Sequence, residues 1–292
     1  MKLATLPAYN EGTAIGSVIL KTKQYVDKVV VVDDGSSDDT ARIARLAGAE
    51  VYSHERNGGY GAAIQSCFTV AKNENADVLV IIDADGQHDP DEIPKVIDPV
   101  LGEGYDLVIG SRFLDPSPNI PLYRRMGIRF LTTFTNIGGN QKISDSQSGF
   151  RAYSKKAISQ LQGNISGMGI GSELVIRAHE LGLTIKEVPV SCRYERLEGS
   201  THHPLVHGAS VFYSILSVIK EKRPLLFFGS SGTLFLVVGL FLGWQSADIY
   251  YSTNYFPIGK ALLAALFIIV AVVAIFSALV LDSISHLLKT KR

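Results

Sequence analysis

Two aspartates spaced by one residue follow an apolar run that predicts a buried β-strand. The run is residues 78–82, and the chain continues as Asp83-Ala84-Asp85-Gly86-Gln87-His88. Carboxylates placed alternately where a strand opens into a loop can share one hard cation, because Mg²⁺ and Mn²⁺ prefer oxygen ligands and often bridge protein carboxylates to phosphates. We therefore predict a divalent-cation site at Asp83, Asp85 and Gln87. The alternative is an acidic solvent-exposed turn, which the apolar strand before it disfavours.

A second acidic cluster ends another strand-like run. The β-branched residues of 28–32 lead directly into Asp33-Asp34-Gly35-Ser36. A carboxylate there can accept hydrogen bonds from a ribose hydroxyl or a base N–H, and Gly35 lets the backbone turn sharply. A third polar cluster, Pro7-Ala8-Tyr9-Asn10-Glu11, follows the apolar run that opens the chain. Because phospho-acceptor domains also place paired aspartates at strand ends, only the three clusters together indicate a function.

Strand-like and helical patterns alternate around these clusters. Helices are expected over 38–47, with Ser37 or Asp38 as the cap, and over 61–73 and 91–101; further strands are expected over 51–54 and 107–110. Such alternation favours an α/β fold with a largely parallel sheet covered on both faces. Ligands bind beyond the carboxyl ends of the strands in such sheets. The elements therefore predict one site at that edge.

Together and in this order, the clusters resemble the family 2 glycosyltransferases, whose catalytic domain has the Rossmann-like GT-A fold. The resemblance is strongest to dolichyl-phosphate mannose synthase and related enzymes that load sugars onto polyprenyl phosphate, and it covers about residues 3–200. It implies that the Asp-x-Asp-x-Gln segment binds the metal and the donor diphosphate. It also implies a set of nucleotide contacts: Pro7, Tyr9, Glu11, Asp33, Asp34, Asn57, Asp83 and Ala84.

The same resemblance points to arginines for the acceptor. Gly110-Ser111-Arg112-Phe113 is similar to the family segment whose arginine binds the acceptor phosphate. Arg124, Arg125 and Arg129 follow on an expected helix, where Arg125 and Arg129 share a face. A guanidinium suits phosphate because it donates a planar fork of hydrogen bonds. The spacing leaves open which of the three assists Arg112; Arg125 and Arg129 are the candidates, and binding to lipid headgroups is the alternative.

Two later segments complete the expected catalytic set. Asp145-Ser146-Gln147-Ser148-Gly149-Phe150-Arg151 is similar to the family segment near the acceptor and the sugar. Arg196, with Gly199 and Ser200, is similar to a segment that closes over the diphosphate. The catalytic residues implied by the resemblance are Asp85, Arg112, Asp145 and Arg196.

Two long apolar segments without a charged side chain lie near the carboxyl end, at about residues 225–244 and 261–281. Each has about 20 residues, the length that crosses about 30 Å of hydrocarbon. The connecting segment, 245–259, contains neither Lys nor Arg, whereas basic residues flank the pair: Lys220, Lys222, Arg223, Lys289, Lys291 and Arg292. By the positive-inside rule, both termini and the amino-terminal domain are cytoplasmic. Two buried helices of a soluble domain are the alternative.

The expected organisation is a cytoplasmic GT-A domain over 1–205, a juxtamembrane amphipathic helix over 206–223 and a transmembrane hairpin over 224–292. The 28 basic and 28 acidic side chains balance, so nucleic-acid binding through bulk charge is not expected. Cys67 and Cys192, the two cysteines, are far apart and predict no disulfide framework.

The expected reaction is the inverting transfer of a hexose or N-acetylhexosamine from a UDP- or GDP-linked donor to dolichyl or polyprenyl phosphate, with Mg²⁺ or Mn²⁺ as cofactor. The product would serve glycan or glycoprotein assembly. The one Trp, Trp244, lies in the first apolar segment, so the Gln-x-x-Arg-Trp segment of processive synthases is absent and a single transfer is expected. Two alternatives stay open: a hydroxyl acceptor with Asp145 as the base, and a non-catalytic membrane scaffold.

Overall fold

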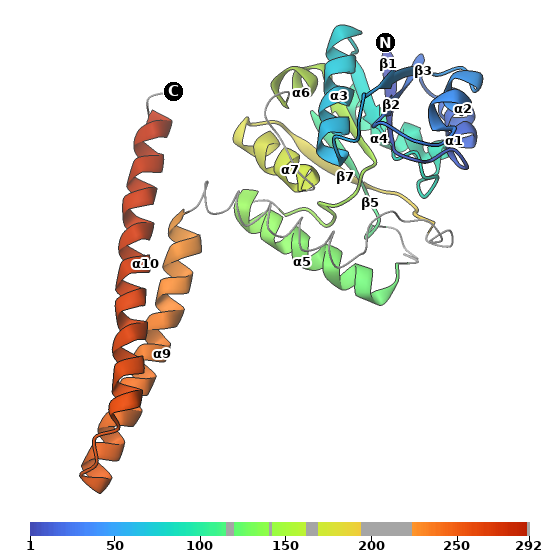
Figure 1. Cartoon of the computed structure of the whole chain (residues 1–292). Coiled ribbons are helices and arrows are strands. Elements are labelled where there is room, and N and C mark those ends of the chain that lie inside the picture. Colours follow the sequence, from blue (N-terminus) through green and yellow to red (C-terminus); the bar gives the residue numbers. More distant parts are fainter. Residues whose placement is uncertain (115–119, 140–141, 162–168, 194–223, 291–292) are drawn as a thin grey trace. The chain divides into compact units, whose positions relative to one another are not determined.

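The chain divides into two compact units. The computed structural model describes residues 1–114, 120–139, 142–161, 169–193 and 224–290 (Figure 1). The first unit is Met1–Ile215 and the second is Leu216–Arg292. The boundary expected at residue 205, the helix expected over 206–223 and the segment that carries Arg196 lie outside the described residues.

The first unit is built on one sheet, to which seven strands contribute within the described residues, in the order β3-β2-β1-β4-β6-β5-β7. All pairs are parallel except those that β6 makes with β4 and β5. The strands are β1 (Lys2–Ala8), β2 (Lys28–Asp33), β3 (Glu50–Ser53), β4 (Val78–Ile81), β5 (Leu107–Ser111), β6 (Arg151–Ser154) and β7 (Ile185–Pro189). The prediction of a largely parallel α/β sheet is confirmed.

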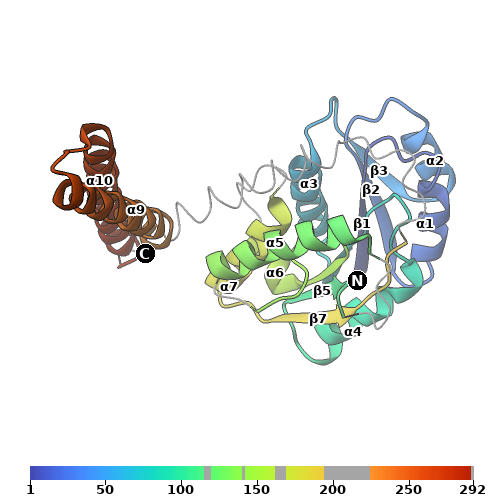
Figure 2. The same ribbon diagram turned by 90° about the horizontal axis from the view of Figure 1, so that it is seen from below.

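Helices cover both faces of this sheet (Figure 2). One face carries α1 (Ile15–Thr22), α2 (Thr40–Leu46) and α4 (Ile93–Gly102), and the other carries α3 (Tyr60–Asn73), α6 (Lys155–Leu161) and α7 (Ile170–Glu180). Strand side chains alternate between the two cores: Val29 and Val31 of β2 face one, and Val30 and Val32 face the other. Because the strands are buried on both sides, they appear in the sequence as apolar runs.

Small differences from the predicted helices have local causes. α2 begins at Thr40 rather than at residue 38, and the Asp38 carboxylate accepts a hydrogen bond from the Thr40 N–H at 2.9 Å. Asp38 thus satisfies a free N–H of the first turn, as a capping side chain does. The helix expected over 91–101 is a 3₁₀ turn, η1 (Pro90–Glu92), followed by α4.

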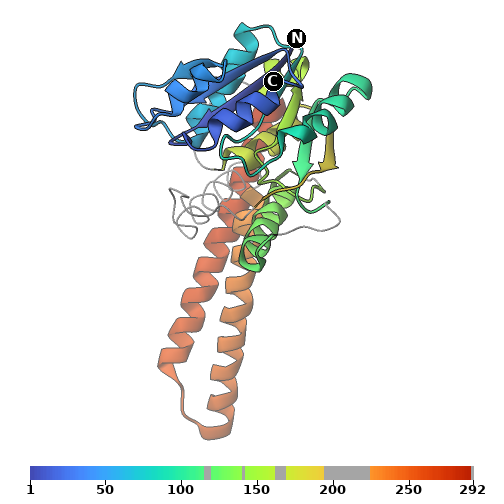
Figure 3. The same ribbon diagram turned by 90° about the vertical axis from the view of Figure 1, so that its right-hand side faces the viewer.

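The second unit is a pair of helices, α9 (Pro224–Thr253) and α10 (Ile258–Thr290), which run side by side (Figure 3). Both are long and apolar enough to cross a membrane, over Phe227–Thr253 and Ile258–Ser283. They are longer than the two predicted segments. The connection, predicted over 245–259, is limited to residues 254–257. The polar residues after Trp244 still form helix; the turn comes only at Asn254, which has a φ of 54°.

Small residues form the seam between these two helices. Gly232, Gly239 and Ser246 recur every seven residues along α9 and are buried. Gly232 faces Ala271 and Gly239 faces Ala264, and these two alanines and Ala278 are buried and recur every seven residues along α10. A Cβ added at Gly239 would lie 2.8 Å from Ile268 Cγ1. The missing side chains therefore allow close backbone approach, which is how helices associate where no hydrophobic effect acts between them.

Candidate active site

The three predicted clusters meet because they follow neighbouring parallel strands. Tyr9 and Glu11 follow β1, Asp33 ends β2 and Asp34 follows it, and Asp83 follows β4. Parallel strands end at the same edge of a sheet, so these loops lie together. β6 runs the opposite way, so the segment before it, which contains Asp145, arrives at this edge as well.

The loops after β1 and β2 are joined by hydrogen bonds. Ser36 Oγ accepts from the Asn10 N–H at 2.9 Å, and the Asn10 side chain accepts from the Ser37 N–H at 2.9 Å. The loop after β3 packs against the loop after β2, since a Cβ at Gly35 would lie 2.7 Å from the Arg56 carbonyl carbon. Gly35 also has a φ of 72°, so both the lack of space and the backbone conformation require a glycine here.

Asp34 is buried, and both of its carboxylate oxygens have protein partners. They accept hydrogen bonds from the Gly58 and Gly59 N–H groups at 2.9 and 2.8 Å. One oxygen also lies 2.6 Å from His54 Nδ1, and His54 Nε2 lies 2.8 Å from Ser66 Oγ on α3. Asp34 therefore shapes the exposed turn that presents Asn57.

Asp83, Asp85 and Glu11 form a cluster of acidic side chains whose pKa values are raised. Burial and the charge of Asp85 raise the pKa of Asp83 to about 7, and burial raises the pKa of Asp85. Burial and both aspartates raise the pKa of Glu11 to about 7. Like charges held together favour a bound cation. Among the described residues no three His, Cys, Asp or Glu side chains form a complete metal cluster.

Asp83 is held in place by close neighbours. Tyr60 Oη lies 3.4 Å from Asp83 Oδ1, and the backbone of Gly149 lies against the same carboxylate. A Cβ at Gly149 would be 2.2 Å from Asp83 Oδ2. Only glycine leaves room for Asp83 at this point.

Arg112 and Asp145 form a buried ion pair. Arg112 Nε and Nη2 donate to the two Asp145 oxygens at 2.7 and 2.8 Å, and Asp145 is 0% exposed. Burial alone would raise the pKa of Asp145, but the Arg112 charge and hydrogen bonds lower it. Glu187 of β7 fixes the same segment, because its carboxylate accepts from the Ser144 and Asp145 N–H groups at 2.7 and 3.0 Å.

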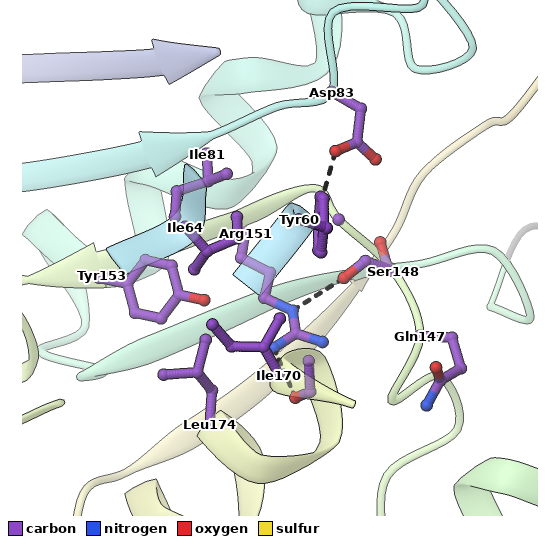
Figure 4. A pocket seen from close by; sticks show the side chains of 12 residues that line it. Tyr60, Ile64, Ile81, Asp83, Gln147, Ser148, Arg151, Tyr153, Ile170 and Leu174 are labelled. Atoms are coloured by element: carbon purple, nitrogen blue, oxygen red, sulfur yellow. Dashed lines mark hydrogen bonds between the residues drawn. The ribbon is translucent and has the colours of Figure 1, made fainter. Parts of the chain in front are cut away.

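A cavity of about 210 Å³ opens beside Asp83 (Figure 4). Arg151 lies in its wall and is buried, donating to the backbone carbonyls of Ser148, Gly171 and Ser146 at 2.8 to 2.9 Å. Ile64, Ile81, Tyr153, Ile170 and Leu174 supply the apolar part of the wall. The cavity thus combines an apolar lining with the Asp83 carboxylate and the Gln147 amide.

The three helical arginines lie on α5 (Leu122–Gly139), which packs against α7. The positive charge of Arg124 opposes the burial that raises the pKa of Asp85, so Arg124 lies within electrostatic reach of the acidic pair. Arg129 lies 5.4 Å from the ring of Phe113. Arg112 also reaches the pair, because its charge opposes the burial and the Asp85 charge that raise the pKa of Asp83.

The segment after β7 reaches the Asp-x-Asp-x-Gln loop. The Arg193 N–H donates to the Gln87 carbonyl at 2.8 Å, and the Arg193 side chain donates to Asp89 at 2.8 Å. Arg196 follows shortly after but lies outside the described residues. His88, not included in the predicted metal set, is buried, with its ring centroid 5.4 Å from that of Phe150.

Several residues of the site carried no recognisable signal in the sequence. Gly149 and Arg151 lie in the segment 145–151, of which only Asp145 was given a role. Glu187 lies in a strand that was not predicted. Their roles arise from contacts across the sheet that β6 creates. Arg124 was not chosen as a candidate, because the helical spacing places Arg125 and Arg129 on one shared face.

The chain belongs to glycosyl transferase family 2, whose model matches residues 4–162. It is 34% identical over 240 residues to the UDP-N-acetylglucosamine–dolichyl-phosphate N-acetylglucosaminyltransferase of Methanococcus voltae, with 74% of this chain and 95% of the relative covered. It is 32% identical over 217 residues to the dolichyl-phosphate hexose transferase of Haloferax volcanii, with 74% and 92% covered. The resemblance to polyprenyl-phosphate glycosyltransferases is confirmed.

Solved structures confirm the GT-A fold. Glucosyl-3-phosphoglycerate synthase from Mycobacterium tuberculosis, in complex with UDP, superposes with a TM-score of 0.58 at 26% identity over 75% of this chain and 79% of that chain. The same synthase has been solved with UDP and Mn²⁺ and with UDP and Mg²⁺. Structural neighbours of this chain therefore bind a divalent metal together with a nucleotide.

Proposed function

We propose that this chain transfers a hexose or N-acetylhexosamine from a nucleotide-sugar to dolichyl or polyprenyl phosphate. The observation that carries the proposal is the meeting of an acidic pair, Asp83 and Asp85, with the Arg112–Asp145 ion pair at one sheet edge, where Gly149 of the Asp145 segment lies against Asp83. A donor diphosphate with its metal and a second, acceptor phosphate need this combination of acids and cations. The relatives named for dolichyl phosphate support it.

In the proposed step an oxygen of the acceptor phosphate attacks the anomeric carbon of the donor sugar. The bond from that carbon to the diphosphate oxygen breaks, and the nucleoside diphosphate leaves with the electron pair, so the configuration inverts. A phosphate acceptor is already ionised near neutral pH, so no base has to remove a proton. The chain therefore contributes positioning and charge stabilisation.

Asp83, Asp85 and Gln87 fit a divalent cation. Their oxygens suit Mg²⁺ or Mn²⁺, and a bound cation would offset the burial that raises the pKa of both aspartates and the Asp85 charge that raises the pKa of Asp83 further. When bound, the metal would neutralise charge on the departing diphosphate.

The other expected roles are retained as parts of the proposal. Pro7, Tyr9, Glu11, Asp33 and the turn that presents Asn57 would hold the nucleotide, with Asp34 acting through that turn. The cavity beside Asp83 would take the sugar, whose apolar ring faces and hydroxyl groups match its mixed lining. Both UDP- and GDP-linked donors are compatible with these contacts. Arg124 joins Arg112, Arg125 and Arg129 as a candidate for the acceptor phosphate.

The ion pair disfavours the hydroxyl-acceptor alternative. Asp145 has a lowered pKa, and both oxygens accept from Arg112, so it is a poor base. Asp145→Asn would also release the Arg112 guanidinium, so loss of activity in that variant would not identify a base. The nature of the labelled product separates the two acceptors more cleanly.

The deciding experiment follows radiolabel from a panel of UDP- and GDP-sugars into organic-extractable lipid. Membranes with the full chain are supplied with a polyprenyl phosphate, with and without EDTA. Label that enters lipid from one donor and is lost on chelation is expected. Label found only in a water-soluble or protein product would refute a lipid-phosphate acceptor.

Asp85→Asn tests the metal assignment. The change removes a charge with little change in shape, and we expect turnover to fall by about a hundredfold or more. Asp98→Asn, at an exposed position of α4, is the matched control and should retain normal turnover. Near-normal turnover of the Asp85 variant would refute the role.

A further inference from the structure

The turn that presents Asn57 is held by a buried carboxylate. The two oxygens of Asp34 accept from the N–H groups of Gly58 and Gly59 at 2.9 and 2.8 Å. The turn packs closely on Asp34, because a Cβ at Gly58 would lie 3.4 Å from Asp34 Oδ1. Asn57 itself is exposed, and its side chain accepts from the Gly59 N–H at 3.0 Å. The position of Asn57 therefore depends on where Asp34 holds the two glycines.

His54 holds Asp34 from another element. It directly follows β3, and its N–H donates to the Asp33 carbonyl at 2.8 Å, which continues the pairing of β3 with β2. The ring Nδ1 lies 2.6 Å from Asp34 Oδ1. The His54 side chain is only 17% exposed, so water has little access to this contact. The ring is thus a fixed partner of the carboxylate that holds the turn.

The two ring nitrogens of His54 have different roles. A carboxylate only accepts hydrogen bonds, so Nδ1 carries the proton and donates it to Asp34. In the neutral ring Nε2 is then an acceptor, and the hydroxyl of Ser66 on α3, 2.8 Å away, is its donor. Ser66 thereby selects the tautomer that Asp34 needs and fixes the plane of the ring.

Because each ring nitrogen has a protein partner, His54 can influence a substrate only through Asp34 and the turn. A buried carboxylate that loses a donor is poorly satisfied, and its remaining partners must adjust. Here those partners are the N–H groups of Gly58 and Gly59, which lie next to Asn57 in the chain. Loss of the Nδ1–H group is therefore expected to displace Asn57.

We propose that His54 is a positioning residue for the donor nucleotide: its Nδ1–H group fixes Asp34, Asp34 fixes the Gly58–Gly59 turn, and the turn places Asn57 against the nucleotide. The inference rests on the proposed function for the contact between Asn57 and the nucleotide. Contacts that hold the nucleotide equally in the ground state and the transition state change KM and leave kcat unchanged. His54 therefore sets the affinity for the donor and not the rate of sugar transfer.

A matched pair of substitutions isolates the Nδ1–H group. Asparagine and leucine have nearly the same shape, and the asparagine amide can place an N–H where the ring has Nδ1. Binding of UDP and of GDP, each with Mn²⁺, is measured by calorimetry on the full chain in detergent. We expect His54→Leu to raise the Kd of the nucleotide that the wild type binds by about tenfold, and His54→Asn to stay within about threefold of the wild type. His179→Leu, at an exposed position of α7, is the control and should bind like the wild type.

Thermal unfolding of the same samples separates positioning from a purely structural role. Equal Kd values for the leucine and asparagine variants overturn the proposal. So does a leucine variant that loses thermal stability but binds the nucleotide like the wild type. If His54→Leu does not fold, Ser66→Ala replaces it, with an expected rise in Kd of about threefold because the ring loses the partner that orients it. A Kd equal to that of the wild type would then overturn the proposal.

Steady-state sugar transfer tests the division between affinity and rate. In His54→Leu the KM of the donor should rise by about tenfold, with kcat within about twofold of the wild type and the KM of the acceptor unchanged. A lower kcat at an unchanged donor KM overturns the positioning role. If the wild type binds a nucleotide but transfers no sugar to polyprenyl phosphate, the proposed function fails while the binding comparison still tests His54. A wild type that binds neither nucleotide overturns both.

Discussion

At the scale of single residues, the acidic pair gives the site its pH dependence. The pKa of Asp83 is raised to about 7, whereas an aspartate in an unfolded chain titrates near about 3.9. Between these values the folded chain holds a proton that the unfolded chain has lost. The free energy of unfolding therefore decreases as the pH rises through this window. We expect the metal-free protein to lose stability toward neutral pH, and added Mg²⁺ to restore it.

The measurement compares thermal unfolding of the metal-free wild type and of Asp83→Asn from about pH 5 to about pH 8. Above about pH 7 the wild type carries a charge that burial and Asp85 destabilise, and the amide does not. The variant should therefore gain stability over the wild type as the pH rises. A difference that is independent of pH would contradict this account.

Gly149→Ala should disable the site without unfolding the domain. The new methyl group would overlap the Asp83 carboxylate, which has to move. Misplacement by about 1 Å can cost about a hundredfold in turnover, and we expect a loss of that order in sugar transfer. Gly102→Ala is the control, because nothing lies within 4 Å of a Cβ there. An active Gly149→Ala enzyme would show that Asp83 is not confined.

The sequence was sufficient to predict the acidic residues but not what confines them. Spacing after an apolar strand predicted Asp83 and Asp85, because strand, loop and carboxylates are contiguous. Gly149 and Glu187 act on residues far away in the chain, and only the insertion of β6 brings them there. The expectation that Asp145 and Arg112 act separately likewise missed their ion pair.

At the scale of elements, the hairpin depends on its glycines. Gly239→Ala adds a methyl group 2.8 Å from Ile268 and 3.2 Å from the Ala264 carbonyl, so the helices must separate. Overpacking of this kind destabilises by about 1–3 kcal/mol. Gly229→Ala, whose Cβ would meet only Leu225 at 4.0 Å, should have little effect. The thermal stability of the hairpin in detergent compares the two variants, and equal stability would refute the seam.

Element prediction succeeded where the apolar pattern was strong and failed where it was absent. The strands up to β5 lie within a residue or two of their predicted positions. Hydropathy ended the first membrane segment at Trp244, but the helix continues to Thr253 because no strong helix breaker comes before Asn254. β6 and β7 were not predicted as strands.

At the scale of the whole molecule, two crossing helices would return the chain to the side it left. We expect both termini in the cytoplasm and the turn at 254–257 on the opposite side, since the flanking segments are basic and the turn is not. Reporter fusions at each terminus and within that turn test this arrangement. A cytoplasmic reporter signal from the turn would contradict two crossings.

The position of β6 also affects the order in which the parts of the domain can fold during synthesis. β1, β2, β3 and β4 are joined by successive crossovers, so this half can fold while later residues are still being synthesised. β6 follows β5 in the chain but must enter between it and β4, and until then β4 has an unpaired edge beside Asp83. The donor side of the site can therefore exist before the acceptor side. The nascent enzyme is most exposed to misassembly and aggregation during that interval.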